Sequence, residues 1–227
     1  MAVTLHQLRK RARAGLLACL VAAVTAGCST IETDITADWD ANRLYNEARD
    51  AVENSDWTRA QDYYTKLESR YPFGRYAQQA QIESAYAYWR DGEAAQCVQT
   101  CDRFLRQYPN HANSDYVLYL KALATLNQRD SFISAILTNE VYERDADAAR
   151  TAFDTFKEIV ERFPNSRYAH EARRRMHELV LAQAYNELKV ARFYYDRHAY
   201  VAAIERAQGV VREFQQTPYS DDALKLI

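Results

Sequence analysis

The chain has 227 residues and an almost balanced charge, with 29 Lys and Arg against 31 Asp and Glu, a formal net charge of −2. A protein that binds nucleic acid usually carries a strong basic excess, so this balance argues against nucleic acid as a partner. The five glycines are too few for phosphate-binding loops or for the tight turns of a strand-rich fold. We therefore expect an all-α protein.

Residues 1–27 have the features of a secretory signal peptide. Four basic residues, Arg9, Lys10, Arg11 and Arg13, precede an apolar run of small residues from 14 to 23. The run is about ten residues long, half of what a bilayer-spanning helix needs. A basic segment followed by a short apolar segment is typical of a cleaved signal and not of a retained membrane anchor.

The end of this signal predicts a lipid attachment site. Thr25-Ala26-Gly27-Cys28-Ser29 resembles the lipobox of bacterial lipoproteins, in which the cysteine is acylated and becomes the mature N-terminus. Thr25 departs from the usual leucine, and the alternative is ordinary cleavage after Ala26, which would leave Cys28 a free thiol. We expect lipidation of Cys28, with residues 28–38 as the tether. Ser29 resembles the sorting signal of lipoproteins sent to the outer membrane.

The remaining chain contains an internal repeat with a spacing of 37 residues. A third copy begins 37 residues further on and resumes after 18 inserted residues. Small residues at fixed positions, large apolar ones between them and a proline after the second helix are typical of a tetratricopeptide helix–turn–helix solenoid. The matching positions are Ala48, Ala60, Leu67, Tyr71 and Pro72; then Ala85, Cys97, Phe104, Tyr108 and Pro109; then Ala122, Ala152, Ile159, Phe163 and Pro164.

The repeat pattern predicts about four and a half units. Residues 39–128 form the N-terminal repeats, 129–145 an insertion with a short helix at 131–137, and 146–227 the C-terminal repeats. No helix breaker occurs between Tyr168 and Asp196, so we expect one helix of about 30 residues, roughly 45 Å long, that projects beyond its neighbours. The last repeat is incomplete, and we expect a longer natural array. The other helices are expected at 39–54, 56–71, 76–91, 93–108, 114–128, 147–163 and 199–214.

The sequence contains no pattern that indicates an enzyme, a cofactor or a metal site. His170 and His177 lie near glutamates, but Arg174 occupies the position at which the metalloprotease motif needs a second histidine. Cys97 and Cys101 lie four apart on one helix, a spacing that strains a disulfide and lacks a second pair for zinc. We expect both cysteines to pack in the interior.

Aromatic residues on the first helices of the units indicate a binding function. In this architecture the first helices line a groove, and an apolar or aromatic peptide would suit these side chains. The alternative interpretation is ordinary packing between helices. The candidate peptide-binding residues are Tyr45, Tyr86, Trp89, Tyr116 and Tyr119.

Several motifs together resemble one known family. They are the lipobox at Cys28, the run Tyr71-Pro72-Phe73-Gly74 with Tyr76 and Gln78-Gln79 after it, Asp102-Arg103-Phe104, Asp115-Tyr116-Val117 and Phe163-Pro164-Asn165-Ser166. In these motifs the chain resembles the BamD, or ComL-type, lipoproteins. The resemblance implies a non-catalytic component of the β-barrel assembly machinery at the periplasmic face of the outer membrane. It also implies five repeats, and as partners the barrel protein BamA, other lipoproteins of the machinery and unfolded outer-membrane proteins.

Two other classes share part of this pattern. A tetratricopeptide lipoprotein for pilus assembly or cell-wall coordination would have the repeats and Cys28 without the run from Tyr71 to Gln79. A lytic transglycosylase on a helical solenoid would need a catalytic domain after the repeats.

The end of the long helix is the candidate docking site for BamA. Arg192 and Arg197 flank Tyr194 and Tyr195, and arginine and tyrosine are enriched at interface hot spots. The resemblance supports this assignment, because it implies that the C-terminal repeats contact BamA. The alternative is that the tyrosines pack on residues 199–214 and the arginines are solvated.

We expect Cys28→Ala to release the protein from the membrane into the soluble periplasmic fraction. Two or more acyl chains anchor a protein stably, whereas a single chain binds marginally. Membrane flotation in cells without BamA measures the change. A mutant that still floats with outer membranes would contradict the lipid anchor.

Overall fold

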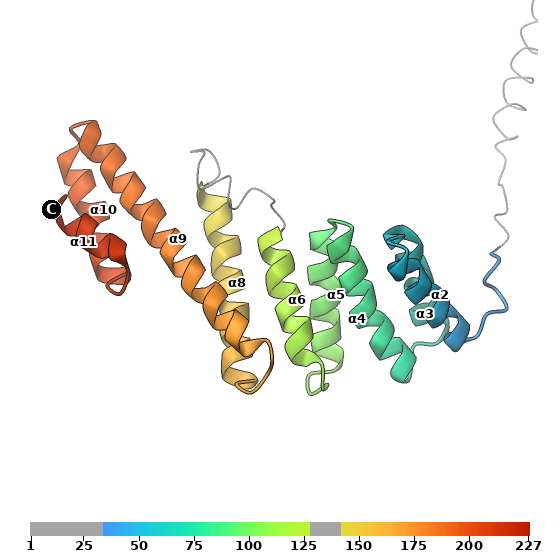
Figure 1. Cartoon of the computed structure of the whole chain (residues 1–227). Helices are drawn as coiled ribbons and strands as arrows, with labels where there is room; N and C mark the ends of the chain where they lie inside the picture. Colours follow the sequence, from blue (N-terminus) through green and yellow to red (C-terminus); the bar gives the residue numbers. More distant parts are fainter. Residues whose placement is uncertain (1–33, 128–141) are drawn as a thin grey trace, which may run out of the picture. The chain divides into compact units, whose positions relative to one another are not determined.

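The computed structural model in Figure 1 describes residues 34–127 and 142–227. In this part of the chain every regular element is an α-helix, which confirms the predicted fold class. Cys28 and the expected helix at 131–137 lie outside the described residues. The helices are α2 (Ala41–Glu53), α3 (Trp57–Arg70), α4 (Arg75–Arg90), α5 (Ala94–Gln107), α6 (Ser114–Asn127), α8 (Tyr142–Arg162), α9 (Ala169–Asp196), α10 (Tyr200–Glu213) and α11 (Pro218–Leu224).

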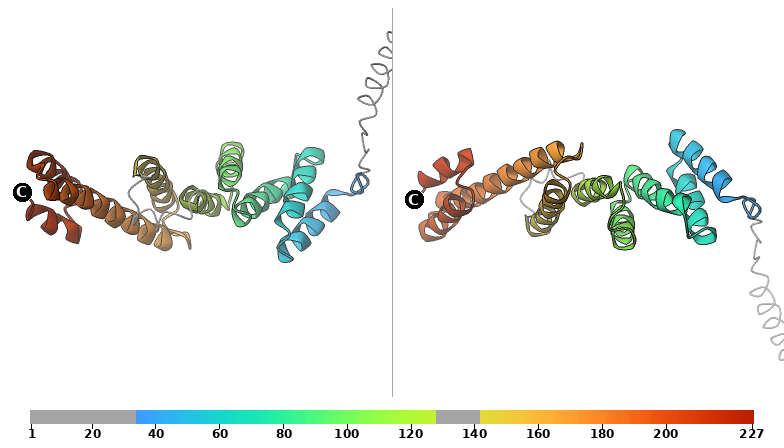
Figure 2. Two further views of the ribbon diagram at one scale, coloured as in Figure 1. Left: turned by 90° about the horizontal axis from the view of Figure 1, so that it is seen from above. Right: turned by 90° about the horizontal axis from the view of Figure 1, so that it is seen from below.

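The chain divides into residues 1–38 and Trp39–Ile227. In the first unit, the carboxylate of Asp34 accepts bonds from the backbone N–H and the hydroxyl of Thr36, at 3.0 and 2.7 Å. In the second unit each helix packs against the next one along the chain (Figures 1 and 2). The first helices α2, α4 and α6 also contact one another in that order, as expected for stacked helical hairpins.

Most helix boundaries agree with the sequence prediction to within three residues. Asp56 caps α3, since its carboxylate accepts the backbone N–H of Arg59 at 3.2 Å. The prediction for α8 was wrong at its start, because the helix begins at Tyr142 and not at Asp147. Residues 142–146 contain neither glycine nor proline, so nothing in the sequence stops the helix from extending toward its N-terminus.

Three of the helical hairpins use the same turn. Ser55, Gly92 and His198 have left-handed φ angles of 59°, 82° and 61°, and each follows the last residue of the first helix by two positions. Such a residue closes a helix by letting a later N–H reach back to a free carbonyl. The closing bonds join Asp56 to Ala51, Glu93 to Tyr88 and Ala199 to Tyr194, with N···O distances of 2.9, 2.9 and 3.0 Å.

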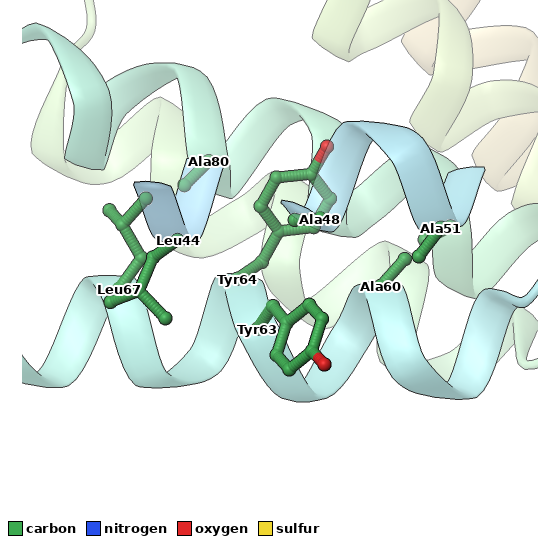
Figure 3. Packing of buried hydrophobic residues seen from close by; sticks show 9 residues of the cluster. Leu44, Ala48, Ala51, Ala60, Tyr63, Tyr64, Leu67 and Ala80 are labelled. Carbon is green, nitrogen blue, oxygen red and sulfur yellow. The ribbon is translucent and has the colours of Figure 1, made fainter. Parts of the chain in front are cut away.

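Alanines at the repeated positions allow the paired helices to approach closely. Figure 3 shows Ala51 and Ala60 facing each other between α2 and α3, with Leu44 beside Leu67 and the ring of Tyr64 nearby. These alanines are also part of the core, since Ala48, Ala51 and Ala60 are all 0% exposed. The same arrangement recurs along the chain, so the core is a series of clusters between neighbouring helices and not one central core.

Cys97 and Cys101 are free and buried in the cluster formed by α4, α5 and α6, which confirms their predicted packing role. They occupy the positions held by Ala60 and Tyr64 in the first repeat. The hydrogen bond with the Cys97 thiol, followed by burial, raises the pKa of Cys101, so this residue stays a neutral thiol and behaves as a small apolar side chain.

The helix α9 joins two of these clusters. It has 28 residues, whereas α6 has 14, and the added 14 residues amount to about four turns, which keeps the same face toward its neighbours. Its first half packs on α8 through Ala172 and Leu179, and its second half packs on α10 through Leu188 and Ala191. The expected 30-residue helix is thus confirmed. Both α10 and α11 pack on its second half.

We expect Phe156→Ala to lower the free energy of unfolding by about 3–5 kcal/mol. Phe156 is 0% exposed in the cluster between α6, α8 and α9, and its loss leaves a cavity. Phe73→Ala is the matched control, because Phe73 is 90% exposed and its loss should change stability by less than about 0.5 kcal/mol. Urea unfolding followed by circular dichroism measures both changes. Equal effects of the two substitutions would contradict this assignment of the core.

Candidate functional site

The five candidate peptide-binding residues lie on α2, α4 and α6, and we call the surface that they form the first-helix face. It comprises Tyr45 on α2, Tyr86 and Trp89 on α4, and Tyr116 and Tyr119 on α6. All five are half-buried and pack against the hydrophobic clusters. Each of these residues is therefore partly packed, as the packing alternative expects, and partly exposed.

Two aromatic pairs repeat along this face. Tyr45 lies 5.5 Å from Tyr76, and Tyr119 stacks on Tyr168 at 4.9 Å between ring centroids. In each pair the second tyrosine begins the next first helix, and the arginine before it lies over its ring, Arg75 at 5.1 Å and Arg167 at 4.7 Å. Sequence reasoning missed Tyr76 and Tyr168, although the repeated Arg-Tyr-Ala motif that contains them was visible.

Tyr116 belongs to the second of these aromatic groups. Its ring centroid lies 5.7 Å from that of Tyr168, and burial raises the pKa of its hydroxyl. The structure thus brings Tyr116 and Tyr119 together against the ring of Tyr168, the N-cap residue of α9. Tyr116 and Tyr119 therefore belong to one aromatic group, while Tyr45 belongs to another.

Tyr86 and Trp89 form a third aromatic group with Trp57 of α3. Their ring centroids are 5.9 Å apart, and Tyr86 meets Trp57 edge to face at 6.3 Å. The guanidinium of Arg90 lies 4.8 Å from the Trp57 ring and donates a 2.7 Å bond to the Tyr86 hydroxyl. The indole N–H of Trp89 is buried without a hydrogen-bond partner in the described part of the chain, so Trp89 offers only its ring.

A carboxylate that the sequence analysis did not single out links the first repeat to the second. Glu83 of α4 accepts the Tyr45 hydroxyl at 3.0 Å, the Gln79 amide at 2.9 Å and the Tyr64 hydroxyl at 3.2 Å. Burial, followed by the negative charge of Glu83, raises the pKa of Tyr45 to about 12 and that of Tyr64 still further. Both tyrosines therefore remain hydrogen-bond donors at neutral pH.

The two candidate docking arginines lie at the end of α9 in different surroundings. Arg192 pairs with Asp222 of α11 at 3.0 Å. Lys225 first, and then Arg192, hold the pKa of Asp222 below its usual value. Arg197 ends α9, and its guanidinium lies 4.1 Å from the ring of Phe193. Arg192 thus joins two helices, whereas Arg197 lies at the exposed turn.

An exposed apolar surface lies at the turn between α9 and α10, and we call it the hairpin tip. It consists of Phe193, Tyr195, Tyr200 and Val201, which are 40%, 46%, 51% and 74% exposed. Tyr195 and Tyr200 meet edge to face at 5.6 Å across the turn, whereas Tyr194 is half-buried. The expectation of an uncovered segment of α9 therefore holds for this tip alone. Sequence reasoning missed Phe193, Tyr200 and Val201, because periodicity does not show which residues at a turn stay exposed.

Other kinds of site find little support in the described residues. None of the helices there is long and apolar enough to cross a membrane, and no group of three metal-ligating side chains occurs there. A small open pocket of about 190 Å³ lies between α9 and α10, lined mainly by charged side chains such as Glu187, Arg206 and Arg212. It contains none of the candidate site residues.

Comparison with known proteins agrees with this architecture. Residues 37–227 match the YfiO family, described as outer membrane lipoprotein. The chain is 43% identical over 208 residues to the outer membrane protein assembly factor BamD of Neisseria meningitidis serogroup B, which covers 92% of this chain and 78% of the relative. It is 35% identical to BamD of Vibrio cholerae, over 88% of this chain and 83% of the relative. It is 30% identical to BamD of Haemophilus influenzae, over 97% of this chain and 83% of the relative. The chain therefore belongs to the BamD family of outer membrane lipoproteins.

Proposed function

We propose that this protein is a non-catalytic scaffold of the outer-membrane β-barrel assembly machinery. The observation that carries the proposal is family membership across residues 37–227, together with relatives named outer membrane protein assembly factor. The protein is held at the periplasmic face of the outer membrane by lipid on Cys28. It binds unfolded outer-membrane proteins and docks on BamA, alongside other lipoproteins of the machinery.

The first-helix face is the proposed site for unfolded outer-membrane proteins. Its ligand is an amphipathic segment with aromatic side chains, such as the C-terminal strand of a barrel protein. Half-buried rings held in place by neighbouring rings provide rigid apolar contact area at low entropic cost. The groups around Tyr45, Trp89 and Tyr119 would each take one side chain of the bound segment.

We expect Trp89→Ala to weaken binding of such a peptide about tenfold, because one aromatic contact contributes roughly 2 kcal/mol. Tyr108→Ala is the matched control, since Tyr108 packs in the same hydrophobic cluster from the end of α5 and lies away from the first-helix face. Fluorescence anisotropy with a labelled peptide, alongside circular dichroism, separates binding from folding. Unchanged affinity in Trp89→Ala combined with Tyr119→Ala would leave these residues a packing role alone.

The hairpin tip is the proposed docking surface for BamA. Phe193, Tyr195 and Tyr200 present exposed rings near the turn, and the guanidinium of Arg197 lies beside the Phe193 ring. Exposed aromatic rings with arginine are enriched at interface hot spots. Arg192 supports the same surface by pairing with Asp222, and so fixes α11 against α9. We therefore assign Arg197 to direct contact and Arg192 to positioning.

We expect Arg197→Glu to abolish co-purification of BamA while peptide binding persists. The new carboxylate would lose its contact with the Phe193 ring and reverse the charge at the centre of the surface. Arg106→Glu, in the last turn of α5, is the control and should retain BamA. If BamA still co-purifies with a folded double mutant, Arg192→Glu with Arg197→Glu, the hairpin tip is not the docking site.

A further inference from the structure

Two half-buried carboxylates of the first two repeats, Glu68 and Glu83, differ in whether a cation lies beside them. Glu68 of α3 has a cation beside it, with the guanidinium of Arg103 at 2.9 Å. Glu83 of α4 has none, because no Lys, Arg or His nitrogen in residues 34–127 and 142–227 lies within 4 Å of its oxygens. Since a buried charge is costly unless it is paired, an unpaired carboxylate at a binding face needs an explanation.

The partners that Glu83 does have are three neutral donors, Tyr45, Tyr64 and Gln79. A carboxylate has about four acceptor positions, and two of these bonds use Oε1 while only one uses Oε2. No group in the described part of the chain therefore occupies the remaining acceptor position on Oε2. The three donors hold the carboxylate in place without neutralising its charge.

The arginines on neighbouring turns have other partners. Arg49 of α2 pairs with Glu53 at 3.4 Å, and Arg90 of α4 lies over the rings of Trp57 and Tyr86. Glu83 lies three residues before Tyr86 on α4, so the two residues share the first-helix face. Its negative charge is thus located among the rings proposed to bind the client segment.

We propose that Glu83 is a specificity site that binds a lysine or arginine side chain of the client segment. The inference rests on the proposed client-binding function and adds a charge requirement to it. The ammonium or guanidinium group donates to the unused position on Oε2, and the rings of Tyr45 and Tyr76, 5.5 Å apart, contact its alkyl stem and add cation–π attraction. An acidic side chain at the same place is repelled.

The chemistry of the neighbours supports this assignment. Because the pKa of Tyr45 is raised to about 12, its hydroxyl stays neutral and continues to orient the carboxylate while the cation binds. A hydrogen bond between two charged partners is roughly twice as strong as a neutral one. A cationic side chain should therefore bind more tightly than an uncharged one of similar length.

The test uses the full chain and two synthetic amphipathic peptides that end in phenylalanine and differ only by Lys against Gln at one internal position, scanned along the peptide. We expect the wild-type protein to prefer the lysine peptide about tenfold at one position. Glu83→Gln should abolish the preference. Glu68→Gln is the matched control and should retain the preference, since Glu68 already has Arg103.

The outcomes separate this inference from the proposed function. If the wild-type protein binds both peptides equally, or if Glu83→Gln retains the preference, the specificity site is refuted while client binding stands. If neither peptide binds, both are refuted. A carbodiimide cross-link between the peptide lysine and a protein carboxylate, located by mass spectrometry, needs no mutant and covers the case in which Glu83→Gln does not fold. We expect the link at Glu83, and a link at other carboxylates alone would overturn the proposal.

Discussion

The close approach of paired helices at alanine positions is the constraint on which the rest of the structure depends. Ala48 and Ala60 are fully buried in the first hairpin, and Ala203 and Ala207 are fully buried in the last. A larger side chain at such a point would separate the helices and expose the leucines and rings that fill the space beside it. Since every cluster lies between neighbouring helices, each hairpin depends on the next one for burial.

The helix α9 shows how this constraint permits variation. About four extra turns keep the apolar face in phase, so one helix serves two clusters, one with α8 and one with α10. The turn after it has the same left-handed geometry as the turns of the first two hairpins. The array therefore continues past the long helix with its packing unchanged, and the hairpin tip becomes exposed at the turn.

The first-helix face and the hairpin tip differ in how their aromatic residues are held. On the face, each ring packs against at least one neighbouring ring, as Tyr119 does on Tyr168 and Trp89 on Tyr86, so the rings are held in place. At the tip, Tyr195 and Tyr200 contact each other, Tyr200 also contacts His198, and both tyrosines are about half exposed. A rigid face suits clients that arrive unfolded, because the client alone loses entropy on binding. An exposed tip suits a folded partner that completes its burial.

The sequence by itself determined the repeat, the helical class and the long helix, because each is written as a local period or as an absence of breakers. The spacing from Ala48 to Ala85 and Ala122, and the unbroken run from Tyr168 to Asp196, can be read without coordinates. The candidate rings were also found from their helical positions. The tertiary structure alone decided their partners, such as Tyr168 for both Tyr116 and Tyr119. It alone showed that, among the residues it describes, Glu83 has no cation beside it while Glu68 has Arg103, because charge pairing between helices depends on distances that no periodic pattern contains.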